Sequence, residues 1–114
     1  MAVLEVQPLP DLPSAAAAAF HLEYLPRAAA LLGDGAQCLT LVFPVADHTH
    51  RSWRLAAVQG LAREHAPARV NAIAGSCAPA IAAALAYLDA ADGVTGQYLP
   101  LDDLGAGLVV LPLQ

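Results

Sequence analysis

The chain has 114 residues, of which 58% are hydrophobic and 13% are charged, and its net charge is −5. All five of its cations are arginines scattered along the sequence, so it lacks the basic cluster typical of a nucleic-acid-binding protein. Because no basic leader precedes an apolar segment and no apolar run approaches about 18 residues, we expect neither a secretory signal nor a membrane span.

A strand and a long helix are the first predicted elements. A short strand over residues 2–6 is followed by closely spaced prolines, and this composition suits the edge of a sheet. The next helix covers residues 14–32, with Ser14 as its N-cap, and Pro26 is expected to kink it or split it in two. Four-residue steps give this helix one apolar face, formed by Phe20, Tyr24, Ala28 and Leu32.

Strands and helices continue to alternate in the rest of the chain. The predicted elements are a strand at 38–44, a helix at 52–66, a strand at 69–74, a helix at 79–91 and a strand at 97–101. Ser76 is the expected cap of the last helix, and a hydrophobic tail occupies residues 107–113. This order predicts an α/β fold with a partial Rossmann-like parallel sheet of about four strands and flanking helices. We expect a single domain over residues 1–114.

Three segments in the second half carry recognisable motifs: LAAVQGLARE, RVNAIAGS and DGVTGQYLPLDD. In this order they resemble the active-site helix, the following strand and the terminal strand of a short-chain dehydrogenase/reductase of the ketoacyl-reductase type. The resemblance covers residues 55–103, and FHLEYLPRAAALL and QCLTLVF resemble the preceding helix and strand more weakly. It implies a truncated member of that family without the cofactor-binding half.

The family's catalytic features are not matched. Nothing resembles the glycine-rich turn that receives the cofactor's pyrophosphate at a helix N-terminus. The family's Tyr-x-x-x-Lys pair falls on Arg51 and Leu55 in one alignment and on Asp47 and Arg51 in another, and the chain has no lysine. Where the family's catalytic serine closes its strand, Phe43 and Pro44 stand here.

These departures predict a catalytically inactive subunit without a cofactor of its own. It would act through oligomerisation, with itself or as the structural or regulatory partner of a full-length reductase. The alternative is an enzyme subunit that contributes to an NAD(P)-dependent, 3-oxoacyl-type ketoreductase, with NAD or NADP supplied through a partner chain. The expected contact residues are Trp53, Ala57, Gly60, Leu61, Glu64, Tyr98 and Leu101.

A weaker alternative is a module that binds a small ligand or a metal ion. Loops after the carboxyl ends of parallel strands line the ligand crevice, so Asp47, His48, His50 and Cys77 are weak candidates as metal ligands. The simpler interpretation of residues 47–50 is a solvated loop. The two cysteines have no CxxC spacing and belong to opposite edges of the sheet, so we expect reduced thiols and a cytoplasmic protein.

Overall fold

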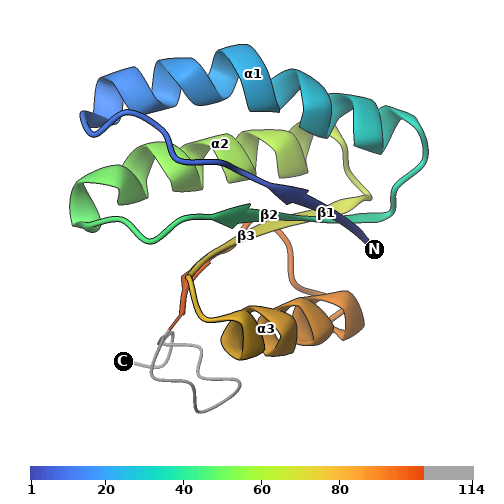
Figure 1. The fold of residues 1–114 in the computed structure, drawn as a ribbon. Helices are drawn as coiled ribbons and strands as arrows, with labels where there is room; N and C mark the ends of the chain where they lie inside the picture. The colour runs from blue at the N-terminus through green and yellow to red at the C-terminus, as the bar shows by residue number, and fades with distance from the viewer. Residues whose placement is uncertain (102–114) are drawn as a thin grey trace.

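The structure, a computed structural model, describes residues 1–101. The elements are β1 (Ala2–Glu5), α1 (Pro13–Gly33), β2 (Cys38–Phe43), the 3₁₀ turn η1 (His48–His50), α2 (Arg51–Glu64), β3 (Arg69–Ala74), α3 (Ala78–Ala90) and β4 (Tyr98–Pro100). All strand pairs are parallel, and the strand order is β1-β2-β3-β4. Figure 1 shows α1 and α2 over one face of this sheet and α3 on the other. The predicted partial Rossmann-like α/β fold is thereby confirmed, with β1 at an edge as its composition indicated. The predicted tail at residues 107–113 lies outside the described residues.

The central strand β2 is buried on both faces because successive side chains enter two different cores. The larger core, on the side of α1 and α2, receives Leu39, Leu41 and Phe43. The smaller core, on the side of α3, receives Val42 together with Ile73 of β3. This double burial explains why every residue of the segment except Thr40 is apolar, rather than every second one.

Helix α1 packs on the sheet through its predicted face. Its buried residues are Ala16, Phe20, Tyr24, Ala28 and Leu32. The helix begins with Pro13, where a missing N–H is tolerated, and Leu12 rather than Ser14 occupies the N-cap position. Pro26 does not split the helix, because α1 continues to Gly33, and the predicted kink at Pro26 stays a prediction. Pro26 lies on the exposed side, so water can solvate the Leu22 carbonyl that has lost its helical donor.

Helix α3 is held to the sheet at its C-terminal end by Arg69 of β3. Nη1 of this arginine donates to the carbonyl oxygens of Leu88 at 2.8 Å and Ala91 at 2.7 Å. A cation here satisfies terminal carbonyls and complements the helix dipole. At the other end, Cys77 occupies the N-cap position, one residue later than the predicted Ser76. No helix within residues 1–101 is long and apolar enough to cross a membrane.

Candidate functional site

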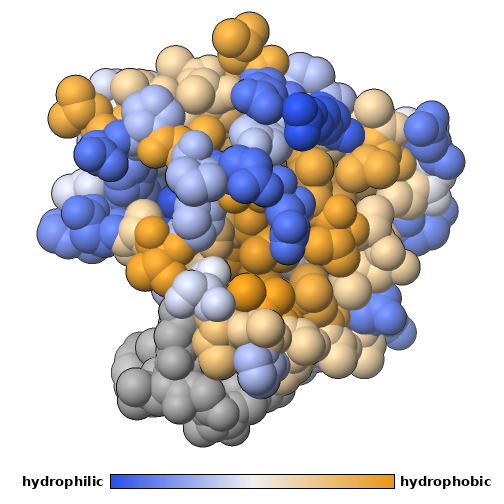
Figure 2. Space-filling model, viewed as in Figure 1, coloured by the Kyte–Doolittle hydropathy of each residue, from blue (hydrophilic) through white to orange (hydrophobic). Residues whose placement is uncertain are grey.

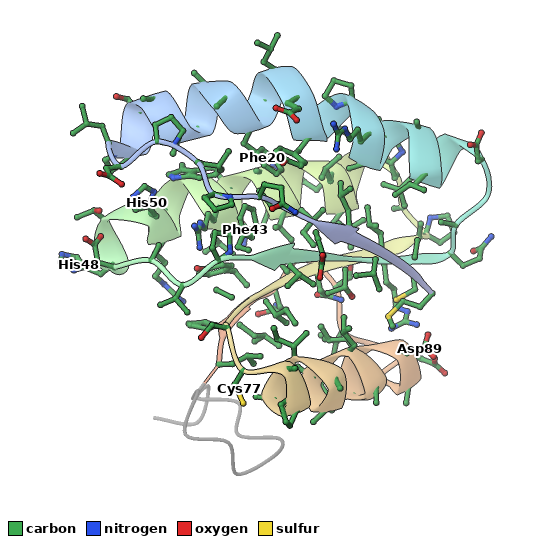
Figure 3. The ribbon with its side chains drawn as sticks, in the orientation of Figure 1. Phe20, Phe43, His48, His50, Cys77 and Asp89 are labelled. Atoms are coloured by element: carbon green, nitrogen blue, oxygen red, sulfur yellow. The ribbon has the colours of Figure 1, made fainter. Side chains whose placement is uncertain are left out.

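The carboxyl ends of β1 and β2 border a pocket of about 330 Å³. Its walls are residues 8–11, which follow β1, and residues 44–47, which follow β2, together with His50 and Arg54. Figure 3 labels His50 and Phe43, the last residue of β2, at this end of the molecule. Open parallel sheets bind ligands beyond the carboxyl ends of their strands, so this pocket is the candidate site.

Arg54 is a buried cation in the wall of the pocket, with a side chain only 2% exposed. Its Nη1 donates to the carbonyl oxygen of Pro44 at 2.9 Å and to the hydroxyl of Tyr98 at 3.0 Å. The guanidinium carbon lies 4.5 Å from the centre of the Phe43 ring, a cation–π distance. Within residues 1–101, Arg54 forms no ion pair and its buried Nε has no hydrogen-bond partner.

Sequence reasoning missed Arg54 as a site residue. Its spacing to Val58 and Leu61 places all three on the buried side of α2. An arginine at a buried position of a helix is unusual, since charged side chains are rarely fully buried without a partner. The spacing of Arg54 to Val58 and Leu61 was therefore the sequence signal that could have identified it as a buried cation.

His50 joins the loop after β1 to the start of α2. Its Nε2 lies 2.9 Å from the carbonyl oxygen of Asp11, and its Nδ1 lies 3.0 Å from Nε1 of Trp53. The indole N–H can only donate, so Nδ1 accepts and Nε2 carries the proton that is donated to Asp11. Both ring nitrogens are engaged in hydrogen bonds, which leaves neither free to bind a metal ion.

The other metal candidates do not converge on His50. The Asp47 carboxylate accepts hydrogen bonds from the hydroxyl and the backbone N–H of Thr49, and these bonds, the hydroxyl's first, lower the pKa of the carboxyl below its ordinary value. His48 is exposed. Figure 3 shows Cys77 beside α3, on the other side of the sheet. Within residues 1–101, no three His, Cys, Asp or Glu side chains form a group that could hold a metal ion, and the metal role of these candidates stays a prediction.

A family model described as "Short chain dehydrogenase-like protein" matches residues 4–101, from β1 to the residue after β4. The chain belongs to this family. The match confirms the resemblance inferred from the motifs of the second half and extends it to the first. A search of curated proteins and a search of solved structures each found no match.

The short-chain dehydrogenase-like chain has no tyrosine–lysine pair at the start of α2. Arg51 is exposed, with its guanidinium carbon 6.0 Å from the centre of the Tyr98 ring. Leu55 is half-buried and packs against the larger core. In the alternative alignment Asp47 takes the tyrosine position and serves as the cap of η1. At the end of β2, Phe43 is fully buried where the family places its serine.

Three of the predicted contact residues on α2, Trp53, Ala57 and Leu61, pack against the core of this short-chain dehydrogenase-like fold. Trp53 lies against the rings of Phe20 and Phe43, at centroid distances of 5.5 and 5.7 Å. Ala57 and Leu61 are buried in the same core. As folded, Ala57 and Leu61 are unavailable to a partner, and Trp53 is half-buried. The remaining members are half-buried Gly60 and exposed Glu64 on α2, with buried Tyr98 and half-buried Leu101 at the far end of the chain's sheet.

Proposed function

We propose that this short-chain dehydrogenase-like chain has no dehydrogenase activity of its own and acts as an associating subunit. The start of α2 carries the proposal. An arginine cannot replace tyrosine as the proton donor and a leucine has no ionisable group, so neither Arg51 nor Leu55 can transfer a proton to a carbonyl substrate. Tyr98, whose ring centre lies 6.0 Å from the Arg51 guanidinium carbon, belongs to β4, and its hydroxyl accepts a hydrogen bond from Arg54.

Apolar surface on the outer side of α1 and α2 supports association. Leu22, in the middle of α1, is 83% exposed. The two helices also expose small side chains, among them Ala15 and Ala18 of α1 and Ala56 of α2. Small side chains let the helices of a second subunit approach closely, and burial of Leu22 would then contribute about 2 kcal/mol before association costs.

The edge strand β1 is a second surface that supports association. Met1 and Val3 are exposed, and Figure 2 shows apolar surface across the middle of the face on which β1 lies. One side of β1 pairs with β2, and the other has no strand beside it within residues 1–101. An edge of this kind is open to a strand from another chain.

Light scattering on the purified protein at tens of micromolar tests the association. We expect the wild type to be an oligomer and Gly60→Glu to shift it toward monomer, because a charge on the outer face of α2 would be unpaired in a helix contact. A Cβ at Gly60 meets no atom within 4 Å, so the fold itself accommodates the new side chain. Gly93→Glu, in a turn with the same free space, is the matched control and leaves the oligomer intact.

A wild-type monomer under these conditions overturns self-association and leaves pairing with a full-length reductase, which is then tested by mixing the two purified proteins. If the oligomer persists in the Gly60→Glu variant, the contact is assigned to β1. In that case Val3→Lys should dissociate it.

The alternative is a subunit that completes an NAD(P)-dependent ketoreductase site in a partner chain. The pocket at the carboxyl ends of β1 and β2 favours this alternative, since it lies where doubly wound folds bind their ligands. It predicts that adding the chain to a complete short-chain reductase raises the rate of NADPH-dependent reduction of a ketoacyl thioester. An unchanged rate with a demonstrated complex contradicts it.

A further inference from the structure

We propose that the pocket at the ends of β1 and β2 binds the carboxylate of a small organic acid through Arg54. This binding function is separate from the association proposed above and does not depend on it. It concerns the residues that follow β1 and β2 and the first turns of α2.

The first argument is the buried charge. Arg54 is almost completely excluded from solvent, and its guanidinium faces aromatic rings and neutral oxygens rather than a carboxylate of residues 1–101. A buried cation without a carboxylate at ion-pair distance is unfavourable because it loses hydration and gains little from opposite charge. An anion that enters the pocket removes this penalty, so the protein and its ligand both gain from the pairing.

The second argument is the hydrogen-bond geometry of the guanidinium. Nη1 uses its two hydrogens on Pro44 and Tyr98, which fixes the orientation of the group. The edge formed by Nε and Nη2 is left, and Nε has no acceptor within residues 1–101. The two parallel N–H groups of such an edge match the two oxygens of a carboxylate in a bidentate pair, and because Nε is buried the carboxylate would displace the atoms that cover it. The same edge would otherwise keep an unsatisfied buried donor.

The third argument is the size and charge of the pocket. A volume of about 330 Å³ suits a small ligand, and the walls include the apolar side chains of Leu9 and Val45. Two exposed carboxylates, Asp11 and Asp47, also lie in the walls. With one buried cation and two carboxylates, the site favours a monoanion over a phosphate dianion, which these carboxylates would repel more strongly. The chemistry therefore fits a monocarboxylic acid with a short apolar tail.

The chain contains one tryptophan, and this makes a direct binding measurement possible. The guanidinium carbon of Arg54 lies 5.7 Å from the centre of the Trp53 ring. We expect sodium butyrate to change the fluorescence of Trp53 saturably, with a dissociation constant in the millimolar range. Sodium chloride at equal ionic strength, and butylammonium chloride with the same tail and the opposite charge, should give no saturable change.

Variants of the full chain assign the binding to Arg54. Arg54→Met should weaken butyrate binding about tenfold or more, because it removes both the charge and the paired donors. Arg54→Lys keeps the charge but loses the two parallel N–H groups, and this variant should bind butyrate more weakly than wild type. Arg63→Met, which removes an exposed arginine outside this pocket, should retain wild-type affinity.

Three results would overturn the proposal. The first is the absence of saturable butyrate binding by the wild type up to tens of millimolar. The second is wild-type affinity in Arg54→Lys, which would exclude the bidentate pair even if Arg54→Met proves too unstable to measure. The third is inorganic phosphate binding as tightly as butyrate, which would make the pocket a site for anions in general.

Discussion

At the scale of single residues, a few buried polar side chains connect elements that are distant in the sequence. Asn71 of β3 is fully buried. Its Nδ2 donates to the Val94 carbonyl at 2.9 Å, and its Oδ1 accepts from the Gln97 backbone N–H at 3.0 Å. These bonds hold the turn before β4, and β4 carries Tyr98, the partner of Arg54. The position of the pocket cation therefore depends on a side chain outside the pocket.

Asn71→Ala should lower the free energy of unfolding by about 2–4 kcal/mol, because two backbone groups lose their partner and a small cavity forms. Urea denaturation followed by the fluorescence of Trp53 measures the change. Gln97→Ala, at an exposed side chain in the same turn, is the control and should change stability by less than about 0.5 kcal/mol. Equal stabilities of the two variants would contradict the bridging role of Asn71.

Asp47 provides a pH-dependent test at the start of α2. Thr49 holds the pKa of the Asp47 carboxyl below its ordinary value of 3.8, so the folded state binds this proton less readily than the unfolded state. The stabilisation is thus fully present above pH 3.8 and is lost as the pH falls through the folded-state pKa. Asp47→Asn keeps the shape of the side chain without its charge.

We therefore expect wild type to be more stable than Asp47→Asn at neutral pH, with a difference that shrinks as the pH drops below 3.8. Urea denaturation at a series of pH values measures this difference. Asp11→Asn corrects for the loss of one negative charge in the neighbouring loop. A difference that grows in acid would contradict the assigned role of Thr49.

At the scale of elements, the packing of α1 and α2 on β2 depends on one aromatic cluster. Phe20 of α1 lies 5.5 Å from the ring of Phe43 and 5.5 Å from that of Trp53, and it stacks on Tyr24 at 6.0 Å. The surrounding core contains many alanines, which bury little area each. A small number of large side chains thus supplies much of the buried apolar surface.

Phe20→Ala should lower the free energy of unfolding by about 3–5 kcal/mol, because it leaves a cavity where three elements meet. Thermal unfolding followed by circular dichroism detects a loss of this size. The control is Glu23→Ala on the exposed side of the same helix, which removes only a surface ion pair with Arg27 and is expected to change stability by about 0.5 kcal/mol or less. Similar losses in both variants would show that the packing assigned to α1 is wrong.

At the scale of the whole molecule, the strand-to-helix turns offer few backbone donors for a dinucleotide. Residues 6–12, between β1 and α1, contain two prolines and no glycine. Both α1 and α3 carry a proline in their first turn, which removes one of the N–H groups that a phosphate would bind at a helix N-terminus. Gly75 is the glycine in the turn between β3 and α3, without the spaced partners of a dinucleotide motif.

We accordingly expect no tight binding of NADH or NADPH by the purified chain. Calorimetric titration measures the affinity, and micromolar binding would contradict the expectation. The chain should also fail to reduce a ketoacyl thioester with either cofactor. Turnover that disappears in Arg51→Ala would establish activity of the chain itself, whereas turnover that persists in that variant indicates a contaminating reductase.

The sequence alone determined the order of the elements, the parallel sheet with β1 at its edge, and the buried face of α1. These features depend on local signals: the period of the apolar residues, prolines and glycines between elements, and the continuous apolar run at β2. The motifs of the second half also identified the family, and with it the positions Arg51 and Leu55. Local signals failed at the helix caps, where Leu12 and Cys77 occupy positions expected for serines.

Tertiary structure decided which groups meet at the candidate site. The sequence predicted Trp53 and Leu61 as contact residues on α2, but the packing of α1 and β2 against them buries Leu61 and partly buries Trp53 inside the chain. The burial of Arg54 likewise depends on Phe43 and Tyr98. These two residues belong to β2 and β4, which are far apart in the sequence. The period of the apolar residues predicts that a side chain is buried. Which residues it then contacts depends on segments that are far apart in the chain.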